Sequence, residues 1–163
     1  MNGRGQLGIA LQKQIKNIIS EKATFIYHTW NPWDRDPHTQ EYEYNKFIKF
    51  VNAQRKHRIV FISTCSQNEN YYVHFKQLAE AYLISNCKDC LIIRLPNLVG
   101  NKGILKKLKD KNVSPYGKIE FLSLNDASKK IVDLINYNGL IKVFSLKGEE
   151  ISAILVNEIL HET

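Results

Sequence analysis

The sequence lacks the features of a membrane-spanning or a secreted protein. No apolar run approaches the ~20 residues that a helix needs to cross a bilayer. Residues 1–5 contain no apolar signal core. The three cysteines are an odd number and too few for a disulfide framework. These absences exclude a disulfide-stapled extracellular domain, and we expect a protein of the reducing cytoplasm with no membrane partner.

What is present is the composition of an ordinary globular domain. Hydrophobic residues make up 44% of the 163 residues and charged residues 24%, and both fractions are usual for a folded protein. No internal repeat, low-complexity tract or linker interrupts the chain. We therefore expect one domain, spanning residues 1–163, that is long enough to bury a substantial core.

The charge balance is basic. The formal net charge of +7 suits an anionic partner but does not say which one. The densest basic stretch runs from Lys102 to Lys118, and a solvated surface is its main interpretation. We do not expect nucleic acid as a partner, because no recognised nucleic-acid-binding motif accompanies the charge.

Helical and strand-like patterns alternate along the chain. Thr39 and Asn125 are candidate N-caps, and Gly139 is a candidate helix stop. We expect helices at roughly 6–21, 39–56, 70–86, 125–138 and 149–160, and strands at 24–28, 58–63, 90–95, 119–122 and 141–145. The apolar runs of the strands are continuous, which indicates a parallel sheet covered on both faces. The fold class is therefore α/β, a three-layer sandwich with a mostly parallel sheet of about four or five strands.

Tyr72 and Lys76 form the strongest chemical pattern in the sequence. A spacing of four places both side chains on one face of a helix, one turn apart. A nearby ammonium favours the phenolate, so we expect Lys76 to lower the pKa of Tyr72 from about 10 toward neutrality. Such a tyrosine can act as a general acid or base at a carbinol or a carbonyl. The alternative to a catalytic role is a purely structural pair, a surface lysine beside a half-buried tyrosine.

Two hydroxyl residues, Ser63 and Thr64, end the predicted strand just upstream. Open α/β sheets bind their ligands at the carboxyl ends of parallel strands. Either hydroxyl could hydrogen-bond the substrate oxygen that Tyr72 protonates. This placement strengthens the catalytic interpretation of Tyr72 and Lys76.

Three motifs in this order resemble the extended short-chain dehydrogenase/reductases, the group that includes nucleotide-sugar epimerases, dehydratases and dTDP-4-dehydrorhamnose reductase. They are Phe-Ile-Ser-Thr at 61–64, Tyr-xxx-Lys-xxx-Glu at 72–80, and Ile-Ile-Arg-Leu-Pro-Asn-Leu-Val-Gly at 92–100. Gly-Arg-Gly-Gln-Leu-Gly at 3–8 resembles the dinucleotide fingerprint of that family, and 121–127 resembles a late strand-to-helix segment. Together the motifs cover nearly the whole chain.

The resemblance implies an enzyme by ancestry, an NAD(P)-dependent reductase or epimerase (an oxidoreductase or isomerase) of nucleotide-sugars such as those of surface polysaccharides. Tyr72 would be the acid/base, Lys76 would hold the nicotinamide ribose, and Thr64 or Ser63 would orient the substrate carbonyl. The other implied site residues are Gly3, Gly5, Gly8 and Asn45 for the cofactor, NAD or NADP, and Asn97, Lys102 and Lys106 for the nucleotide-sugar.

The chain departs from the family pattern in its N-terminal part. The helix at 6–21 leads directly into 24–28, which resembles the fourth strand of the family. The first strands, which cradle the adenosine, have no counterpart, and the 65–71 segment is short. We therefore expect a shortened Rossmann-like fold that binds cofactor weakly or not at all. The alternative function is a catalytically degenerate remnant that acts as a binding or regulatory module without cofactor.

Three smaller features complete the sequence analysis. Cys87 and Cys90 have metal-like spacing but no second ligand pair, so we expect no metal. Trp30 and Trp33 could stack on a base or a sugar, although packing of a loop on the sheet is the favoured interpretation. The apolar strand at 24–28 would form an open sheet edge, and the helices at 39–56 and 70–86 form dimer contacts in the family, so we expect a homodimer.

Overall fold

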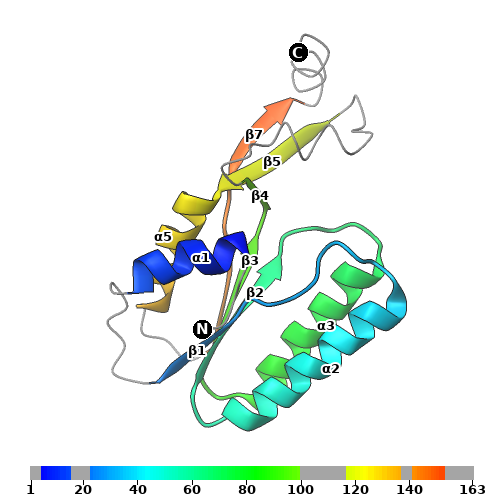
Figure 1. The fold of residues 1–163 in the computed structure, drawn as a ribbon, viewed down its shortest axis with the longest axis vertical. Helices are drawn as coiled ribbons and strands as arrows, with labels where there is room; N and C mark the ends of the chain where they lie inside the picture. Colours follow the sequence, from blue (N-terminus) through cyan, green and yellow to red (C-terminus); the bar gives the residue numbers. More distant parts are fainter. Residues whose placement is uncertain (1–4, 16–22, 100–116, 137–140, 153–163) are drawn as a thin grey trace.

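The computed structural model describes residues 5–15, 23–99, 117–136 and 141–152, and its centre is a four-stranded parallel sheet (Figure 1). The strand order is β1-β2-β3-β6, and all three pairings are parallel. The strands are β1 (Thr24–Tyr27), β2 (Arg58–Thr64), β3 (Cys90–Leu95) and β6 (Ile141–Ser145). This arrangement confirms the predicted α/β fold with a parallel sheet.

Helices cover both faces of the sheet (Figure 1). The helices α2 (Pro37–Gln54) and α3 (Tyr71–Asn86) lie together on one face, and α1 (Gln6–Gln14) and α5 (Leu124–Ile135) lie together on the other. Alternate residues of β2 serve the two faces, since Ile59 and Phe61 join the α2–α3 core while Val60 and Ile62 join the α1–α5 core. Continuous apolar strands are required because both faces are buried.

A second, three-stranded sheet extends from the carboxyl end of β3. Its order is β4-β5-β7, formed by β4 (Asn97–Val99), β5 (Lys118–Ser123) and β7 (Glu149–Ser152). The β4–β5 pair is parallel and the β5–β7 pair is antiparallel. Gly148 precedes β7 and lies directly against the backbone of Phe121, where any Cβ would collide. The absence of a side chain at Gly148 therefore permits this close approach.

The structure corrects the predicted elements at four places. The helix predicted from Thr39 begins at Pro37, because the Asp36 side chain caps it by accepting hydrogen bonds from the amides of His38 and Thr39. Ser123, rather than Asn125, caps α5. Residues 149–152 form β7 instead of a helix, and β4 was not predicted. The predicted helix at 6–21 is described only up to residue 15, and residues 153–160 of the helix predicted at 149–160 lie outside the described residues.

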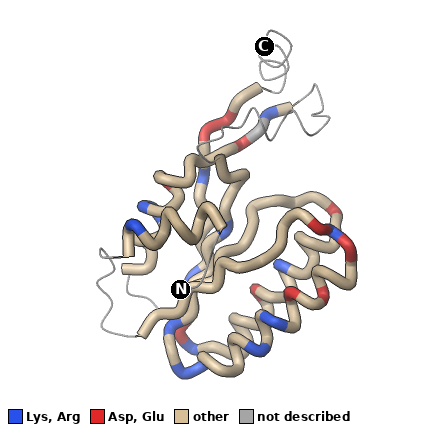
Figure 2. The backbone as a smooth tube through the Cα atoms, in the orientation of Figure 1, with Lys and Arg blue, Asp and Glu red and all other residues tan. Residues whose placement is uncertain are grey.

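Charged side chains lie mainly on the outer surface. In α2 the acidic residues lie in the first half of the helix and the lysines in the second half, and charges of both signs also lie in the loop that precedes it (Figure 2). The exceptions among the described residues are Glu43, Arg58, Lys76 and Glu80, and the last two, at 4% and 5% exposure, contact the carboxyl-end residues Ile62 of β2 and Arg94 of β3. Buried charges are costly unless they are paired. The buried Lys76 and Glu80 therefore mark the carboxyl end of the sheet as a candidate functional site.

Candidate active site

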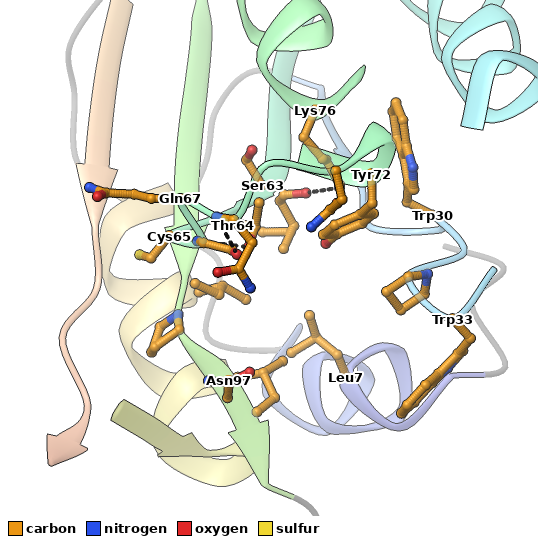
Figure 3. Close-up of a pocket in the computed structure, with 18 of the residues that line it drawn as sticks. Leu7, Trp30, Trp33, Ser63, Thr64, Cys65, Gln67, Tyr72, Lys76 and Asn97 are labelled. Atoms are coloured by element: carbon orange, nitrogen blue, oxygen red, sulfur yellow. Dashed lines mark hydrogen bonds between the residues drawn. The ribbon is translucent and has the colours of Figure 1, made fainter. Parts of the chain in front are cut away.

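A cavity of about 500 Å³ lies at the carboxyl ends of β1, β2 and β3 (Figure 3). Its walls come from the loop after β1, the loop after β2, the start of α3, the β3–β4 junction and Leu7 of α1. Tyr72, Lys76, Ser63, Thr64 and Asn97 line it. The cavity therefore brings together five of the site residues predicted from sequence, at the end of the sheet where open α/β folds bind ligands.

Tyr72 is positioned by the first turn of α3. The Asn70 side chain caps this helix by accepting a hydrogen bond of 3.1 Å from the amide of Val73, which supplies a partner to an otherwise unpaired helical donor. Tyr72 is partly buried, and its ring packs against the α2–α3 core. Lys76 follows one turn later on the same face, as the spacing predicts.

Lys76 is held in a largely apolar environment. Its Nζ donates a hydrogen bond of 2.7 Å to the carbonyl of Ile62 and lies 4.6 Å and 4.5 Å from the ring centroids of Trp30 and Phe61. Burial lowers the pKa of Lys76 from 10.5 to about 7, although the carboxylates of Glu80 and Glu43 act to raise it. Burial therefore favours release of the proton from this amine at a lower pH than from an ordinary lysine.

The predicted lowering of the Tyr72 pKa is wrong. Burial raises this pKa, and a hydrogen bond with Thr64 and the charge of Arg35 only partly counter the rise. The Lys76 ammonium cannot reverse it, because Nζ lies 5.8 Å from the Tyr72 ring centroid and is bound to the Ile62 carbonyl. The phenol is consequently favoured over the phenolate in this environment.

The two hydroxyl residues at the end of β2 differ in their environments. The Thr64 hydroxyl acts to lower the pKa of Tyr72 and so lies near the phenol, and its Oγ1 accepts a hydrogen bond of 3.1 Å from the amide of Ser66. The Ser63 Oγ is buried without a hydrogen-bond partner among the described residues. Thr64 is thus the hydroxyl nearer the cavity space beside the phenol, whereas Ser63 lies deeper in the wall.

Glu80 is a structural residue. The Arg94 guanidinium contacts both of its carboxylate oxygens, with an Nη2–Oε2 distance of 2.6 Å. This bidentate pair joins α3 to β3 beside a second cavity of about 340 Å³, which shares Ser63, Thr64 and Lys76 with the first. Such pairs add geometric specificity as well as energy, so the pair fixes the helix that carries Tyr72 and Lys76.

The remaining predicted site residues are dispersed. Gly5 is the N-cap of α1 and Gly8 is buried within that helix. Asn45 is exposed on α2 and does not line the cavity. Asn97 lines the cavity, but its side chain also donates a hydrogen bond of 3.0 Å to the carbonyl of Glu120. Gly3, Lys102 and Lys106 lie outside the described residues.

The loop after β1 contributes residues that the sequence analysis did not assign to the site. Trp30 is 8% exposed and packs on the core, as the packing interpretation predicted. Trp33, in contrast, is 71% exposed and lines the cavity, as does Arg35. The sequence signal for Trp33 was a tryptophan in a loop that contains Pro32 and Pro37. No sequence pattern pointed to Arg35.

No cluster of three or more His, Cys, Asp or Glu side chains that could hold a metal occurs within the described ranges. Cys87 and Cys90 are instead buried in the α2–α3 core. None of the helices described has both the length and the apolar character needed to span a bilayer.

Solved structures share this fold at low sequence identity. A dTDP-4-dehydrorhamnose reductase from Clostridium acetobutylicum is 16% identical with a TM-score of 0.70, and the match covers 97% of this chain and 78% of that one. The enzyme WbmH from Bordetella bronchiseptica, solved with NAD+, is 14% identical with a TM-score of 0.67, and the match covers 96% and 61%. RMD from Pseudomonas aeruginosa, solved with NADPH, is 14% identical with a TM-score of 0.68, covering 96% and 79%.

These matches establish a Rossmann-like fold of the kind found in nucleotide-sugar reductases and epimerases. The chain spans about three fifths of the length of the two Bordetella bronchiseptica enzymes it resembles, WbmH and WbmG. No protein-family model matches the sequence, and no curated protein matches it significantly.

Proposed function

We propose that the chain binds a nicotinamide cofactor and a nucleotide-sugar at the 500 Å³ cavity and reduces or epimerises the sugar. The observation that carries the proposal is that Tyr72, Thr64 and Lys76 line one cavity at the carboxyl end of β2. The fold likeness to a dTDP-4-dehydrorhamnose reductase and to a UDP-N-acetylglucosamine 4-epimerase supports the same conclusion. As in the family that the motifs resemble, the protein would belong to the short-chain dehydrogenases/reductases.

Tyr72 and Thr64 would handle the proton in this reaction. The Tyr72 phenol is held in its protonated form by burial, so it can donate a proton to the oxygen of a sugar carbonyl. The Thr64 hydroxyl would hydrogen-bond the same oxygen and orient it. Lys76, whose pKa is lowered by burial, would return a proton to the site after the step.

The residues present fit the nicotinamide end of a cofactor better than the adenosine end. The N-cap of α1 is Gly5, which has no side chain to cap the helix, and a helix N-terminus can bind a pyrophosphate through its amides. Leu7 of the same turn lines the cavity. When bound, the nicotinamide would supply or accept a hydride. In the described part of the chain, β1 is the edge strand, and no strands lie beyond it to hold an adenosine.

A second candidate is a binding or regulatory module without cofactor. It is favoured by the Lys76 amine, which is bound to the Ile62 carbonyl and packed against aromatic rings instead of projecting freely into the cavity. The edge position of β1 favours it as well. In this case the cavity would recognise a sugar or a nucleotide without transforming it.

Titration with NADH and NADPH, followed by cofactor fluorescence and calorimetry, separates the two candidates. The enzyme proposal requires saturable binding and oxidation of the cofactor in the presence of a nucleotide-linked 4-keto sugar. We expect the affinity of the isolated chain to be weak, because of the open β1 edge. No cofactor oxidation at millimolar cofactor would support the second candidate, and a micromolar dissociation constant would show that another segment or chain supplies the missing wall.

A further inference from the structure

The Lys76 amine lies over the faces of aromatic rings. Its Nζ is 4.6 Å from the ring centroid of Trp30 and 4.5 Å from that of Phe61, and the Tyr72 ring lies further away at 5.8 Å. All three distances fall within the ~6 Å over which the negative face of an aromatic ring attracts a cation. The amine is therefore surrounded by ring faces, in addition to the Ile62 carbonyl that accepts its hydrogen bond of 2.7 Å.

A buried glutamine fixes the Trp30 indole. Gln40, 0% exposed in α2, accepts a hydrogen bond of 2.8 Å from the indole N–H. Its amide donates to the carbonyl of Asn31 at 2.9 Å and to that of Asp34, which anchors the loop that follows Trp30. The indole also packs against the Phe61 ring, at a centroid distance of 6.0 Å. Buried hydrogen bonds of this kind specify a single conformation, so the fold sets the plane of the indole before any ligand arrives.

Lys76 lies where the two cavities meet. It lines both of them, whereas Trp30, at 8% exposure, lines the larger one. The two side chains lie side by side at the wall of that cavity (Figure 3). Because Lys76 borders both cavities in a poorly hydrated wall, its charge acts strongly on whatever occupies them.

The charged form of Lys76 needs compensation at this position. Burial lowers the pKa of Lys76, and the carboxylates of Glu80 and Glu43 act against this. Neither carboxylate serves the amine alone. Arg94 contacts both oxygens of Glu80, and Lys46 lies 3.3 Å from Glu43. The other ionisable side chains that line the two cavities are His28, Arg35, Cys65, Tyr72, Glu120 and Lys147. The ring faces and the backbone carbonyl, in contrast, contact the amine directly.

We propose that Trp30 is a positioning residue for Lys76, whose indole face holds the ammonium against the Ile62 carbonyl and favours the charged form at the edge of the cavity. Gln40 is part of the same arrangement, because it sets the plane of the indole. The assignment rests on the proposed function, in which Lys76 returns a proton to the site. Trp30 thereby sets the pH range over which that proton is available.

The test is an NMR titration of Lys76 in the full chain without ligands, using lysine isotopically labelled at Cε. The Lys76 signal is the one that is absent from Lys76→Met. Tryptophan is replaced by mono-, di- and trifluorotryptophan in the Trp33→Phe variant, in which Trp30 is the only tryptophan left. Fluorine withdraws electron density from the ring face, which weakens the attraction for a cation while the shape of the ring changes little. We expect the pKa of Lys76 to fall stepwise with fluorination, by about 0.5 in total.

Trp33→Phe with ordinary tryptophan is the matched control and should titrate like the wild type. Gln40→Leu should also lower the pKa of Lys76, because it releases the indole from its fixed plane. Where cofactor is oxidised, the basic limb of the pH profile should move to lower pH by the same amount as the titration. A purely structural role of Trp30 would move neither the titration nor the profile.

Other results would overturn the proposal. An unchanged Lys76 titration in the fluorinated protein or in Gln40→Leu would refute the positioning role. A pKa that rises toward 10.5 would show that the ring acts only by excluding water, and would refute it as well. A titration that falls as expected, with no cofactor oxidised at any pH, would support the positioning by Trp30 and refute the proposed function, so the two failures are distinguishable.

Discussion

The Lys76 amine and the Tyr72 hydroxyl share one enclosed environment, and burial shifts both of their pKa values toward the neutral form. A spacing of four residues correctly predicted that both side chains would share a helix face. It could not predict the depth of the cavity wall, nor that the Ile62 carbonyl and two aromatic rings would engage the amine. Those partners come from other elements of the fold. The direction of the Tyr72 pKa shift likewise depends on burial by tertiary packing, which residue spacing does not reveal.

Lys76 should make stability depend on pH. Below about pH 7 the residue is protonated in both the folded and the unfolded chain. Between about 7 and the ordinary value of 10.5 the unfolded chain holds the proton and the folded chain has released it. The free energy of unfolding therefore rises with pH in this window, by up to about 1.4 kcal/mol per pH unit from this residue.

The variant Lys76→Met isolates this contribution. The wild type should gain stability relative to Lys76→Met between about pH 7 and about pH 9, the accessible part of the window. Urea unfolding at several pH values measures this gain. Lys49→Met, at an exposed position of α2, is the matched control. A difference between wild type and Lys76→Met that does not change with pH would contradict the lowered pKa of Lys76.

Tyr72→Phe should abolish turnover while the fold is retained. The substitution removes only the hydroxyl, and loss of a general acid costs roughly 10²–10⁴ in rate. Cofactor oxidation with a nucleotide-linked 4-keto sugar measures the effect, and circular dichroism checks the fold. Tyr71→Phe, at the exposed neighbouring position, is the control. Undiminished turnover in Tyr72→Phe would remove this residue from the mechanism.

At the scale of elements, helix ends were harder to predict than helix existence. Thr39 looked like an N-cap from sequence, but its hydroxyl donates to Asp34 while Asp36 caps α2. Similarly, Glu-Glu-Ile-Ser at 149–152 has no clear strand signal by itself. It forms β7 because β5 offers a partner, and because Lys118 pairs with Glu150 at 2.8 Å across the two strands. The error at Thr39 arose from competing carboxylates nearby in sequence, whereas the error at 149–152 arose because a strand distant in sequence overrode local preference.

The loop at 30–36 should depend on Gln40. Gln40→Leu keeps a side chain of similar size but leaves the buried Trp30 indole N–H and two backbone carbonyls without their partner. We expect a loss of about 2–3 kcal/mol in the free energy of unfolding, measured by chemical denaturation. Asn52→Ala, which removes an exposed hydrogen bond with Tyr82, should change stability by less than about 0.5 kcal/mol. Equal effects of the two substitutions would show that the loop is not held by Gln40.

At the scale of the whole molecule, the alternation of strands and helices predicted the parallel sheet and its covered faces. The small sheet was not predicted, because β4 has only three residues and β5 pairs with segments distant in sequence. The structure also places β1 at an edge of the main sheet, with β2 as its partner and no strand on its other side within the described residues. An apolar edge of this kind favours pairing with another chain.

We therefore still expect a homodimer, and the structure narrows the surface that would form it. In the two helices expected to form the contact, Phe47 and Leu83 are fully buried and face the core. The apolar residues exposed on the outer side of α3 include Tyr71 and Leu78, whose spacing of seven places them on one helix face. A charge at Leu78 would be desolvated in a dimer that buries this face, so Leu78→Glu should dissociate it.

Light scattering at micromolar concentration measures the assembly, with Ile84→Glu on a different side of α3 as the control because it is also exposed. The wild type and Ile84→Glu should be dimers, and Leu78→Glu should be a monomer. A dimer that survives Leu78→Glu would locate the contact at the β1 edge, where main-chain pairing does not depend on a single side chain. A wild-type monomer would refute the homodimer itself, since neither the α3 face nor the β1 edge would then be covered by a second copy.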